Sequence, residues 1–491
     1  MSASKNKKIR KQQLESGVDK RAAAEAKAAA ERRKSNIKYT VIGVVVVVIL
    51  AVLMILNSAW ISRSLTAVTI DGEDYSAAEL NYYYSASYMN FYSTYQYYME
   101  SGMFFDPSQS LGDQEYMDGM TWREYFMDAA VNTMTEVQLL NNAAEEAGFV
   151  LPAEYEEQYN TAVESFKTEW AMYGYSSLEQ YINLSYGKGV TMEMLETELY
   201  RNMVASAYSE AIYNGYEYST EELDAYYAEH TADMDMVTYA YVSSTDGSLD
   251  VNAIAAAVNG TDEEAFHAYM HENYEGTEPT TLINAGSNLS AAYREWLVDA
   301  ARQPGDATGI ETESGASYAV MFLGRNDNNY PTVNFRHILI NAEDTDADGT
   351  FSAEEIAAAK DEAEALYAEW QAGDATEDSF AALANTMSDD GGSNQNGGLY
   401  ELVYQDAMVE PVNDWIFDAA RQIGDTGIVS YEGSNYTGTH ILYFAGADEL
   451  TYAQYQADQA LRTDAHNAWY DSLTENSTSA TKNLFLCGKH I

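Results

Sequence analysis

The sequence is poor in cysteine and in basic residues. Cys487 is the single cysteine, which excludes an intramolecular disulfide framework and any metal site that needs several thiolates. Lys and Arg number 26 against 77 Asp and Glu, so the formal net charge is −51. A field of that sign repels phosphate backbones and excludes nucleic acid as a partner. The 491 residues are 46% hydrophobic, which is enough for about three folded domains and argues against wholesale disorder.

The few basic residues gather at the N-terminus. Residues 1–38 carry twelve Lys or Arg and four acids, whereas the remainder is strongly acidic. The apolar stretch Tyr39–Ile61 follows, and its length fits the ~20 residues of a membrane-crossing helix. The positive-inside rule then predicts a single-pass protein of the cell membrane, with a cytoplasmic N-terminus and an extracytoplasmic bulk. A cleaved signal peptide is the alternative, but 38 residues are long for its charged region, so we favour a retained anchor.

The first part of the predicted exported chain has helical patterns. Residues 68–80 predict a strand, a turn at Asp71-Gly72, and a helix capped by Ser76 with Glu79 three residues later. The helix from Leu80 to Phe105 holds too many Tyr, Phe and Met side chains for one buried stripe. Ordinary exposed tyrosines explain any single one of them, but for the set we favour an adaptable binding surface.

An internal repeat dominates the second half. Residues 295–306 and 414–425 are identical at eight of twelve positions. Each block lies between an opening strand, Val237–Val242 or Val333–Ile338, and a closing strand, Tyr318–Gly324 or His440–Gly446. The chain therefore contains two tandem copies of one α/β module.

The second copy carries a run of motifs in a fixed order. They are Asn334–Ile340, Ser388–Leu399, Met408, Trp415–Phe417, Gly424-Asp425 and Gly438–Leu442. Through them residues 331–447 resemble a parvulin-type peptidyl-prolyl cis-trans isomerase. With the helical segment and a C-terminal helix, the exported chain more loosely resembles the PrsA and SurA foldases.

The resemblance and the repeat together imply an α+β fold. A helical chaperone-like domain is followed by two tandem parvulin-like α/β modules, the first of them degenerate, and one N-terminal transmembrane helix precedes them. The expected parts are a basic cytoplasmic segment 1–38, a transmembrane helix 39–61, a helical domain 66–232, a degenerate module 233–325, an isomerase domain 331–447, and a C-terminal helix and tail 448–491.

The resemblance also implies a site. His337 and His440 would be paired histidines on adjacent central strands, and Asp390 would take the position that parvulins give to Cys or Asp. The proline pocket would be formed by Leu399, Met408 and Phe417, with Thr437 at its edge. One departure is Val412, which stands where the family usually has Phe.

The predicted reaction suits these residue types. Rotation about a prolyl bond breaks amide resonance but makes and cuts no bond, so neither a nucleophile nor a cofactor is required. An apolar socket with polar groups that prefer the twisted amide lowers the barrier by differential binding. The expected partners are unfolded or partly folded exported proteins with prolyl bonds.

A binding-only chaperone with the same fold is the alternative function. It is motivated by Val412 and by the first copy, in which Tyr241 and Tyr318 align with His337 and His440. The loop that would hold a counterpart of Asp390 is missing there, because the opening strand and the Trp lie closer together in the sequence. We therefore expect the first copy to fold like a parvulin without catalysing.

A further motif lies inside the second copy. Residues 344–355 match the spacing of an EF-hand calcium loop, with Gly349 at the sharp turn. The oxygen ligands would come from Asp344, Asp346, Asp348, Thr350 and Glu355. A structural Ca²⁺ and a solvated acidic turn that caps a helix at Ser352 are equally favoured alternatives.

Overall fold

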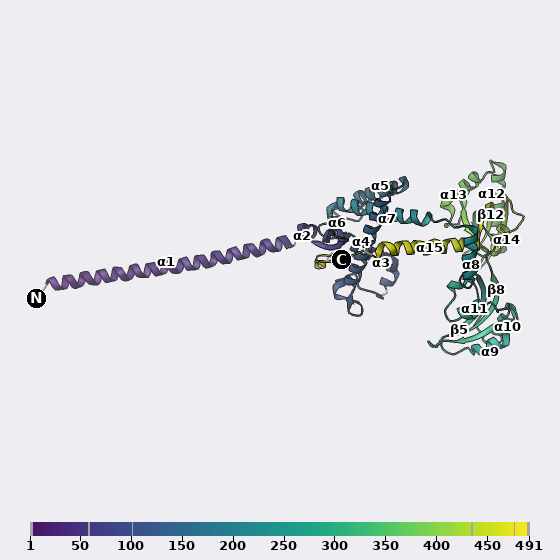
Figure 1. Cartoon of the computed structure of the whole chain (residues 1–491), viewed down its shortest axis with the longest axis horizontal. Helices are drawn as coiled ribbons and strands as arrows, with labels where there is room; N and C mark the ends of the chain where they lie inside the picture. Colours follow the sequence, from purple (N-terminus) through teal and green to yellow (C-terminus); the bar gives the residue numbers. More distant parts are fainter. Residues whose placement is uncertain (1–2, 57–58, 101, 434–435, 476, 489–491) are drawn as a thin grey trace. The chain divides into compact units, whose positions relative to one another are not determined.

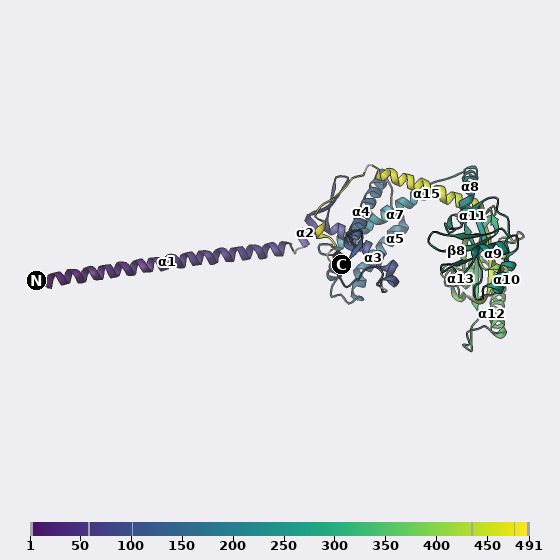
Figure 2. The same cartoon turned by 90° about the horizontal axis from the view of Figure 1, so that it is seen from below.

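The computed structural model of the chain describes residues 3–56, 59–100, 102–433, 436–475 and 477–488. The chain forms two compact units. The first is Met1–Gly215 together with His466–Ile491, and the second is Tyr216–Ala465. Both units are drawn in Figure 1 and, turned by 90°, in Figure 2.

The N-terminal segment is a single helix, α1 (Ala3–Leu56), drawn in purple in both views. Its part Ala24–Val52 is long and apolar enough to cross a membrane, and none of that stretch is buried. The predicted apolar helix is thus present, but its end differs from the predicted Ile61. Ile61 belongs to the short helix α2 (Ala59–Ser64) and is buried in the first unit.

The predicted hairpin and helix start follow. Strands β1 (Thr66–Ile70) and β2 (Glu73–Ser76) pair antiparallel, and Asp71 and Gly72 have the positive φ angles that a two-residue turn requires. The Ser76 N–H donates to Glu79 and the Glu79 N–H donates to the Ser76 hydroxyl. This capping box begins α3 (Ala77–Glu100), as the sequence predicted.

Helices make up most of the rest of the first unit. They are α4 (Trp122–Glu146), α5 (Ala153–Thr168), α6 (Leu178–Ser185) and α7 (Met192–Asn214), with the hairpin β3 (Glu115–Met117) and β4 (Met120–Thr121) before α4. The core between α3 and α4 is apolar and aromatic, with Leu80, Tyr84, Phe126 and Met134 fully buried. The C-terminal strand β13 (Ser479–Thr481) pairs with β1, so the tail completes this unit.

The second unit begins with α8 (Thr220–Met234) and contains two sheets of the same design. The first module consists of β5 (Met236–Ser244), α9 (Val251–Val258), α10 (Glu263–Asn273), β6 (Thr280–Ala285), α11 (Arg294–Val298), β7 (Ala307–Glu311) and β8 (Ser317–Asn326). Its antiparallel sheet has the order β6-β5-β8-β7.

The second module has the same strand order, β10-β9-β12-β11. Its elements are β9 (Pro331–Asn341), α12 (Ala353–Ala372), α13 (Glu377–Met387), β10 (Leu399–Val403), α14 (Glu410–Ile416), β11 (Thr426–Glu432) and β12 (Thr437–Thr451). The helix α15 (Tyr452–Thr474) follows. The repeat found in the sequence is therefore a repeat of topology.

The repeated block forms the same Arg–Trp and Arg–Asp contacts in both modules. In the second module the Arg421 guanidinium lies 4.1 Å from the centre of the Trp415 ring, and in the first Arg302 lies 4.8 Å from that of Trp296. Each Arg also pairs with two nearby aspartates of its block. The Trp, the Arg and the two aspartates that the blocks share thus make the same contacts in both modules.

Candidate active site

Strand alternation divides the side chains of β9 between two faces. Ile338 and Ile340 face the helices α12 and α13, where they join the cluster that contains Phe380. Phe335 and His337 therefore face the opposite side, on which α14 packs. In the antiparallel partner β12, His440 lies opposite Leu339, which places it on the same face as His337.

The two histidines are buried and in contact. The Nδ1 atoms of His337 and His440 are 3.1 Å apart, and the rings stack with an interplanar angle of 15°. The exposed fractions are 6% for His337 and 4% for His440. Burial, followed by the nearby His337, lowers the pKa of His440 to about 3, so this imidazole is neutral at physiological pH.

Asp390 connects the pair to the loop after α13. Its Oδ2 lies 2.8 Å from His337 Nε2 and accepts hydrogen bonds from the hydroxyls of Ser393 and Tyr400, while Oδ1 accepts from the Gly392 N–H. The bond to His337, and then those from Ser393 and Gly392, hold the pKa of Asp390 well below its usual range. A half-buried, fully ionised carboxylate thus lies at the edge of the histidine pair.

One arrangement of protons satisfies all these contacts when both histidines are neutral. His337 Nε2–H donates to the Asp390 carboxylate, which leaves Nδ1 of His337 as an acceptor. His440 then donates through its Nδ1–H, and its Nε2 accepts from the Tyr436 hydroxyl, 3.1 Å away. Tyr436, His440, His337 and Asp390 form a directional chain in which each tautomer is set by its neighbour.

Sequence reasoning missed three members of this network, Ser393, Tyr400 and Tyr436. Tyr400 stacks on Phe335, with ring centres 5.6 Å apart, and touches the His337 ring edge to face. Ser393 lies within the Ser388–Leu399 motif, three residues after Asp390, so the sequence could have identified it as a neighbour of that carboxylate. Tyr436 lies four residues before His440, a spacing that identifies it only once the β11–β12 hairpin is known.

Two of the four predicted pocket residues lie on the histidine face of the sheet, and the other two do not. Met408 and Phe417 are half-buried and pack against the apolar cluster on the histidine face, to which the buried Val412 belongs. Leu399, by contrast, pairs with Arg336, and alternation places it on the opposite face from Tyr400. Thr437 is buried at the start of β12, three residues before His440, and alternation also directs it away from the histidines.

Comparison with known protein families identifies a domain in the second module. The sequence model described as "PPIC-type PPIASE domain" matches residues 320–443, from within β8 to within β12. The chain contains a parvulin-type peptidyl-prolyl isomerase domain. The match leaves the helical unit and most of the first module outside it.

Solved structures similar to the chain include foldases and SurA-like chaperones. A peptidylprolyl isomerase (PrsA) of Bacillus anthracis is 19% identical with a TM-score of 0.19, over 30% of this chain and 59% of that one, so the chain spans less than two thirds of it. The foldase protein PrsA of Streptococcus pneumoniae is 13% identical over 74% and 90%, with a TM-score of 0.24. A SurA-like chaperone structure from Campylobacter jejuni is 12% identical over 84% and 96%, with a TM-score of 0.18. Comparison with curated proteins gives no match.

The first module has tyrosines where the parvulin domain has its histidines. Tyr241 lies opposite Val320, and Tyr318 opposite Ser243, which is the same register relation that joins His337 and His440. The ring of Tyr293 packs against both tyrosines. Within 236–326, all of which the structure describes, the helices α9 and α10 stand in place of the longer segment that carries Asp390.

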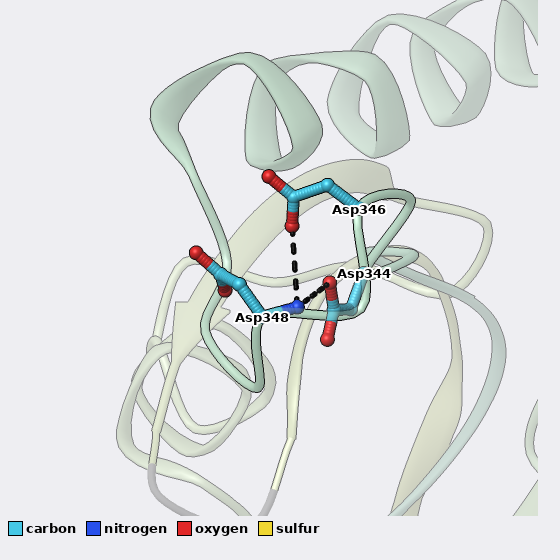
Figure 3. Close-up of side chains that lie close together, drawn as sticks. All are labelled: Asp344, Asp346 and Asp348. Carbon is cyan, nitrogen blue, oxygen red and sulfur yellow. Dashed lines mark hydrogen bonds between the residues drawn. The ribbon is translucent and has the colours of Figure 1, made fainter.

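The acidic loop of the parvulin domain is drawn in Figure 3. The carboxylates of Asp344, Asp346 and Asp348 each offer an oxygen within 4.8 Å of the others. Glu355 accepts from the Ser352 N–H and hydroxyl, completing a capping box, and also from the Thr345 N–H. The Thr350 hydroxyl donates to Asp348. The loop therefore caps α12 at Ser352, as the solvated-turn alternative expects. Its carboxylates and hydroxyls are also the kind of oxygen ligands that Ca²⁺ prefers.

Proposed function

We propose that the chain is a membrane-anchored, extracytoplasmic peptidyl-prolyl isomerase that assists the folding of exported proteins. The observation that carries the proposal is the buried His337–His440 pair joined to the ionised Asp390, inside a domain of the parvulin family. The client would be an unfolded or partly folded chain with exposed prolyl bonds.

The geometry suits catalysis by positioning. The barrier of about 18–20 kcal/mol arises from amide resonance, and a catalyst lowers it by binding the twisted amide more tightly than either planar isomer. Met408 and Phe417 supply the apolar surface for a prolyl ring beside the network. The fixed carboxylate of Asp390 supplies a polar group that needs no rearrangement during rotation. The histidines hold Asp390 in place and are positioning residues in this mechanism.

A proline-peptide exchange assay on the full-length chain in detergent tests the proposal. We expect Asp390→Ala and His440→Ala to lower kcat/KM by about a hundredfold, a typical loss for a preorganised polar group. Asp361→Ala, which removes an exposed carboxylate of α12, is the matched control and should retain wild-type activity. Equal rates at background for all four proteins would overturn the isomerase.

The alternative is a client-binding chaperone without catalysis. Val412 favours this alternative, because Val is smaller than the Phe that the resemblance implies at this position. Only Met408 and Phe417 would then contact a prolyl ring. In this case the exchange assay stays at background, while the full-length chain still suppresses aggregation of an unfolded client.

The first unit offers a surface for such clients. Exposed aromatic and Met side chains continue along α3 and beyond it, namely Met89, Tyr95, Tyr97, Tyr98 and Met103. A cavity of about 410 Å³ lies at the β3–β4 hairpin and is lined by Tyr116, Met117, Met120 and Tyr125, with Asp118 and Asp128 beside them. Large flat rings and flexible thioethers accept many apolar side chains, which suits a client of variable sequence.

The proposed topology rests on α1 and its basic flank. The apolar part of α1 would cross the membrane, with the twelve Lys and Arg of residues 1–38 on the cytoplasmic side. Protease added to spheroplasts should then degrade both folded units and leave the N-terminal segment protected. Protection of the folded units instead would exclude this orientation.

A further inference from the structure

The first module has an edge strand that is exposed on both faces. Among the described residues β6 pairs only with β5, and it forms one edge of the sheet. Residues 280–283 of this strand are all exposed. Leu282 and Ile283, which alternation places on opposite faces, are 37% and 39% exposed. The strand therefore presents both its backbone and its apolar side chains to solvent.

Other sheet edges in the second unit are protected in ways that β6 is not. At the opposite edge of the same sheet, α9 packs against β7, and the Ala307 N–H donates to the Asn259 side chain at the end of that helix. In the second module, the edge strand β10 shifts register between Tyr400 and Val403, and Leu402 between them has a positive φ. Such a bulge prevents a further strand from pairing. β6 pairs with β5 without a register shift and contains no charged residue and no Pro.

The direction of the β6 backbone groups follows from one hydrogen bond. Gly286, directly after the strand, donates its N–H to the Asp235 carbonyl, on the side of β5. Successive residues of a strand direct their N–H and C=O groups alternately to its two sides. Thr281 and Ile283 therefore direct theirs away from β5, toward the open edge. An added strand would find a donor and an acceptor on each of these two residues.

The surroundings of the edge are acidic. Residues 236–293 include eight Asp or Glu and no Lys or Arg. Glu263 of α10 accepts a hydrogen bond from the Thr281 hydroxyl, and Glu278 lies two residues before the strand. Two copies of β6 placed side by side would bring like charges together, whereas an extended segment with Lys or Arg would meet opposite charges. The charge distribution thus favours a basic peptide over a second copy of this chain.

We propose that β6 binds an extended client segment that carries Lys or Arg, as an additional strand of the first sheet. Main-chain hydrogen bonds to an edge strand do not depend on the side chains of the added peptide, which suits clients of variable sequence. The exposed Leu282 and Ile283 add apolar contact on the two faces. The identity of the ligand as a client rests on the proposed function, but the binding does not require the isomerase site.

A titration of a labelled, proline-free peptide with the full-length chain in detergent tests this surface. The peptide has about ten residues, alternates Lys and Val, and is measured by fluorescence anisotropy at about 0.15 M salt, where long-range attraction is screened. Ile283→Pro removes an N–H that faces the open edge and no hydrogen bond to β5. We expect it to weaken binding at least about tenfold. Ile283→Thr keeps the N–H and a β-branched side chain, so this matched control should stay within about twofold of the wild type.

The charge preference has its own comparison. A peptide of the same length that alternates Glu and Val should bind the wild type at least about tenfold more weakly than the Lys peptide. Equal affinity for the two peptides would overturn the preference for basic clients.

Hydrogen exchange gives a second readout that needs no variant. When the wild type binds the Lys peptide, the amides of Thr281 and Ile283 should exchange at least about tenfold more slowly. No gain in their protection would overturn the proposal. In the free Ile283→Pro variant, unchanged exchange of the β5 and β8 amides checks that the sheet is intact.

Two further outcomes separate this inference from its competitors. A wild-type dimer that Ile283→Pro dissociates would assign the edge to a second copy of the chain and overturn the proposal. Binding of the Lys peptide that is equal in wild type and in Ile283→Pro, with the sheet intact, would also overturn it. Because residue 283 lies outside the parvulin domain, Ile283→Pro should keep wild-type prolyl exchange rates, so a failure here is distinct from a failure of the proposed isomerase.

Discussion

At the residue scale, the neutral state of His440 has a consequence for stability. Its pKa is near 6.5 when unfolded and is lowered to about 3 in the fold, chiefly by burial. Between these values the unfolded chain binds a proton that the folded one does not. His440 therefore favours folding fully above pH 6.5, and this contribution is lost as the pH falls toward 3.

We therefore predict that His440→Gln flattens the acid dependence of the parvulin domain. In the wild type, His440 adds as much as about 1.4 kcal/mol per pH unit to the fall in unfolding free energy between pH 6 and 4. Hydrogen exchange of the β9 and β12 amides across this range measures the difference. Parallel profiles for the two proteins would mean that His440 is not held neutral.

A second residue-scale prediction concerns Tyr436. In the proton chain its hydroxyl donates to Nε2 of His440, while the Nδ1–H of His440 donates to Nδ1 of His337. Tyr436→Phe removes only the first of these hydrogen bonds, so His440 should keep its proton on Nδ1, because Asp390 still makes Nδ1 of His337 an acceptor. Imidazole ¹⁵N spectra of histidine-labelled full-length chain report the tautomer directly. An Nε2–H signal from His440 in the variant would contradict the proposed proton chain.

Some site residues could be predicted from the sequence and others could not, and the difference lies in what determines the orientation of each side chain. His337, His440 and Asp390 stand in local motifs, and the antiparallel register of β9 with β12 brings the two histidines to one face. Tyr400 and Leu399 are neighbours in the same motif, so which of them faces the histidines depends on the register of β10 against β9. A shift of one residue exchanges the two faces, and the sequence pattern here does not fix that register.

At the scale of elements, the junction of α14 and β11 is closely packed. The Trp415 ring packs over the backbone of Gly427, where a Cβ atom would lie 2.4 Å from the indole nitrogen. We predict that Gly427→Ala destabilises the parvulin domain by about 1–3 kcal/mol, because the ring must shift. Gly391→Ala is the control, since a Cβ there meets nothing within 4 Å. Equal hydrogen exchange of β12 in both variants would contradict this role of Gly427.

The loop before α12 carries the calcium prediction from the sequence. The carboxylates of Asp344, Asp346 and Asp348 already lie together, and Gly349 has the positive φ that the sharp turn needs. We expect a full-length titration with Ca²⁺ to give saturable heat that Asp346→Asn together with Asp348→Asn removes. The exposed pair Asp361→Asn and Asp378→Asn serves as the control for net charge. No heat at millimolar Ca²⁺ would leave the loop as a helix cap alone.

At the scale of the whole molecule, composition and patterning predicted the order of the parts along the chain. They did not predict the long-range strand pairing that completes the first unit. The apolar helix, the helical segment and the tandem modules each have a local signature in the sequence. The strand β13 has none, because three residues gain their strand character only by pairing with β1, more than 400 positions earlier in the chain. Contacts of such separation depend on the folded core and not on local propensity.

The tail gives a prediction that concerns the first unit as a whole. The guanidinium of Arg123 in α4 donates to the carbonyls of Leu484 and Cys487, and the Cys487 side chain is fully buried in the core. A chain that ends at Thr474 loses these contacts and makes β1 an edge strand. We expect the β1 amides to exchange at least about tenfold faster, whereas those of β9 and β12, in the other unit, keep their rates. Unchanged protection of β1 would show that the hairpin with β2 suffices, and faster exchange in both units would show that the two unfold together.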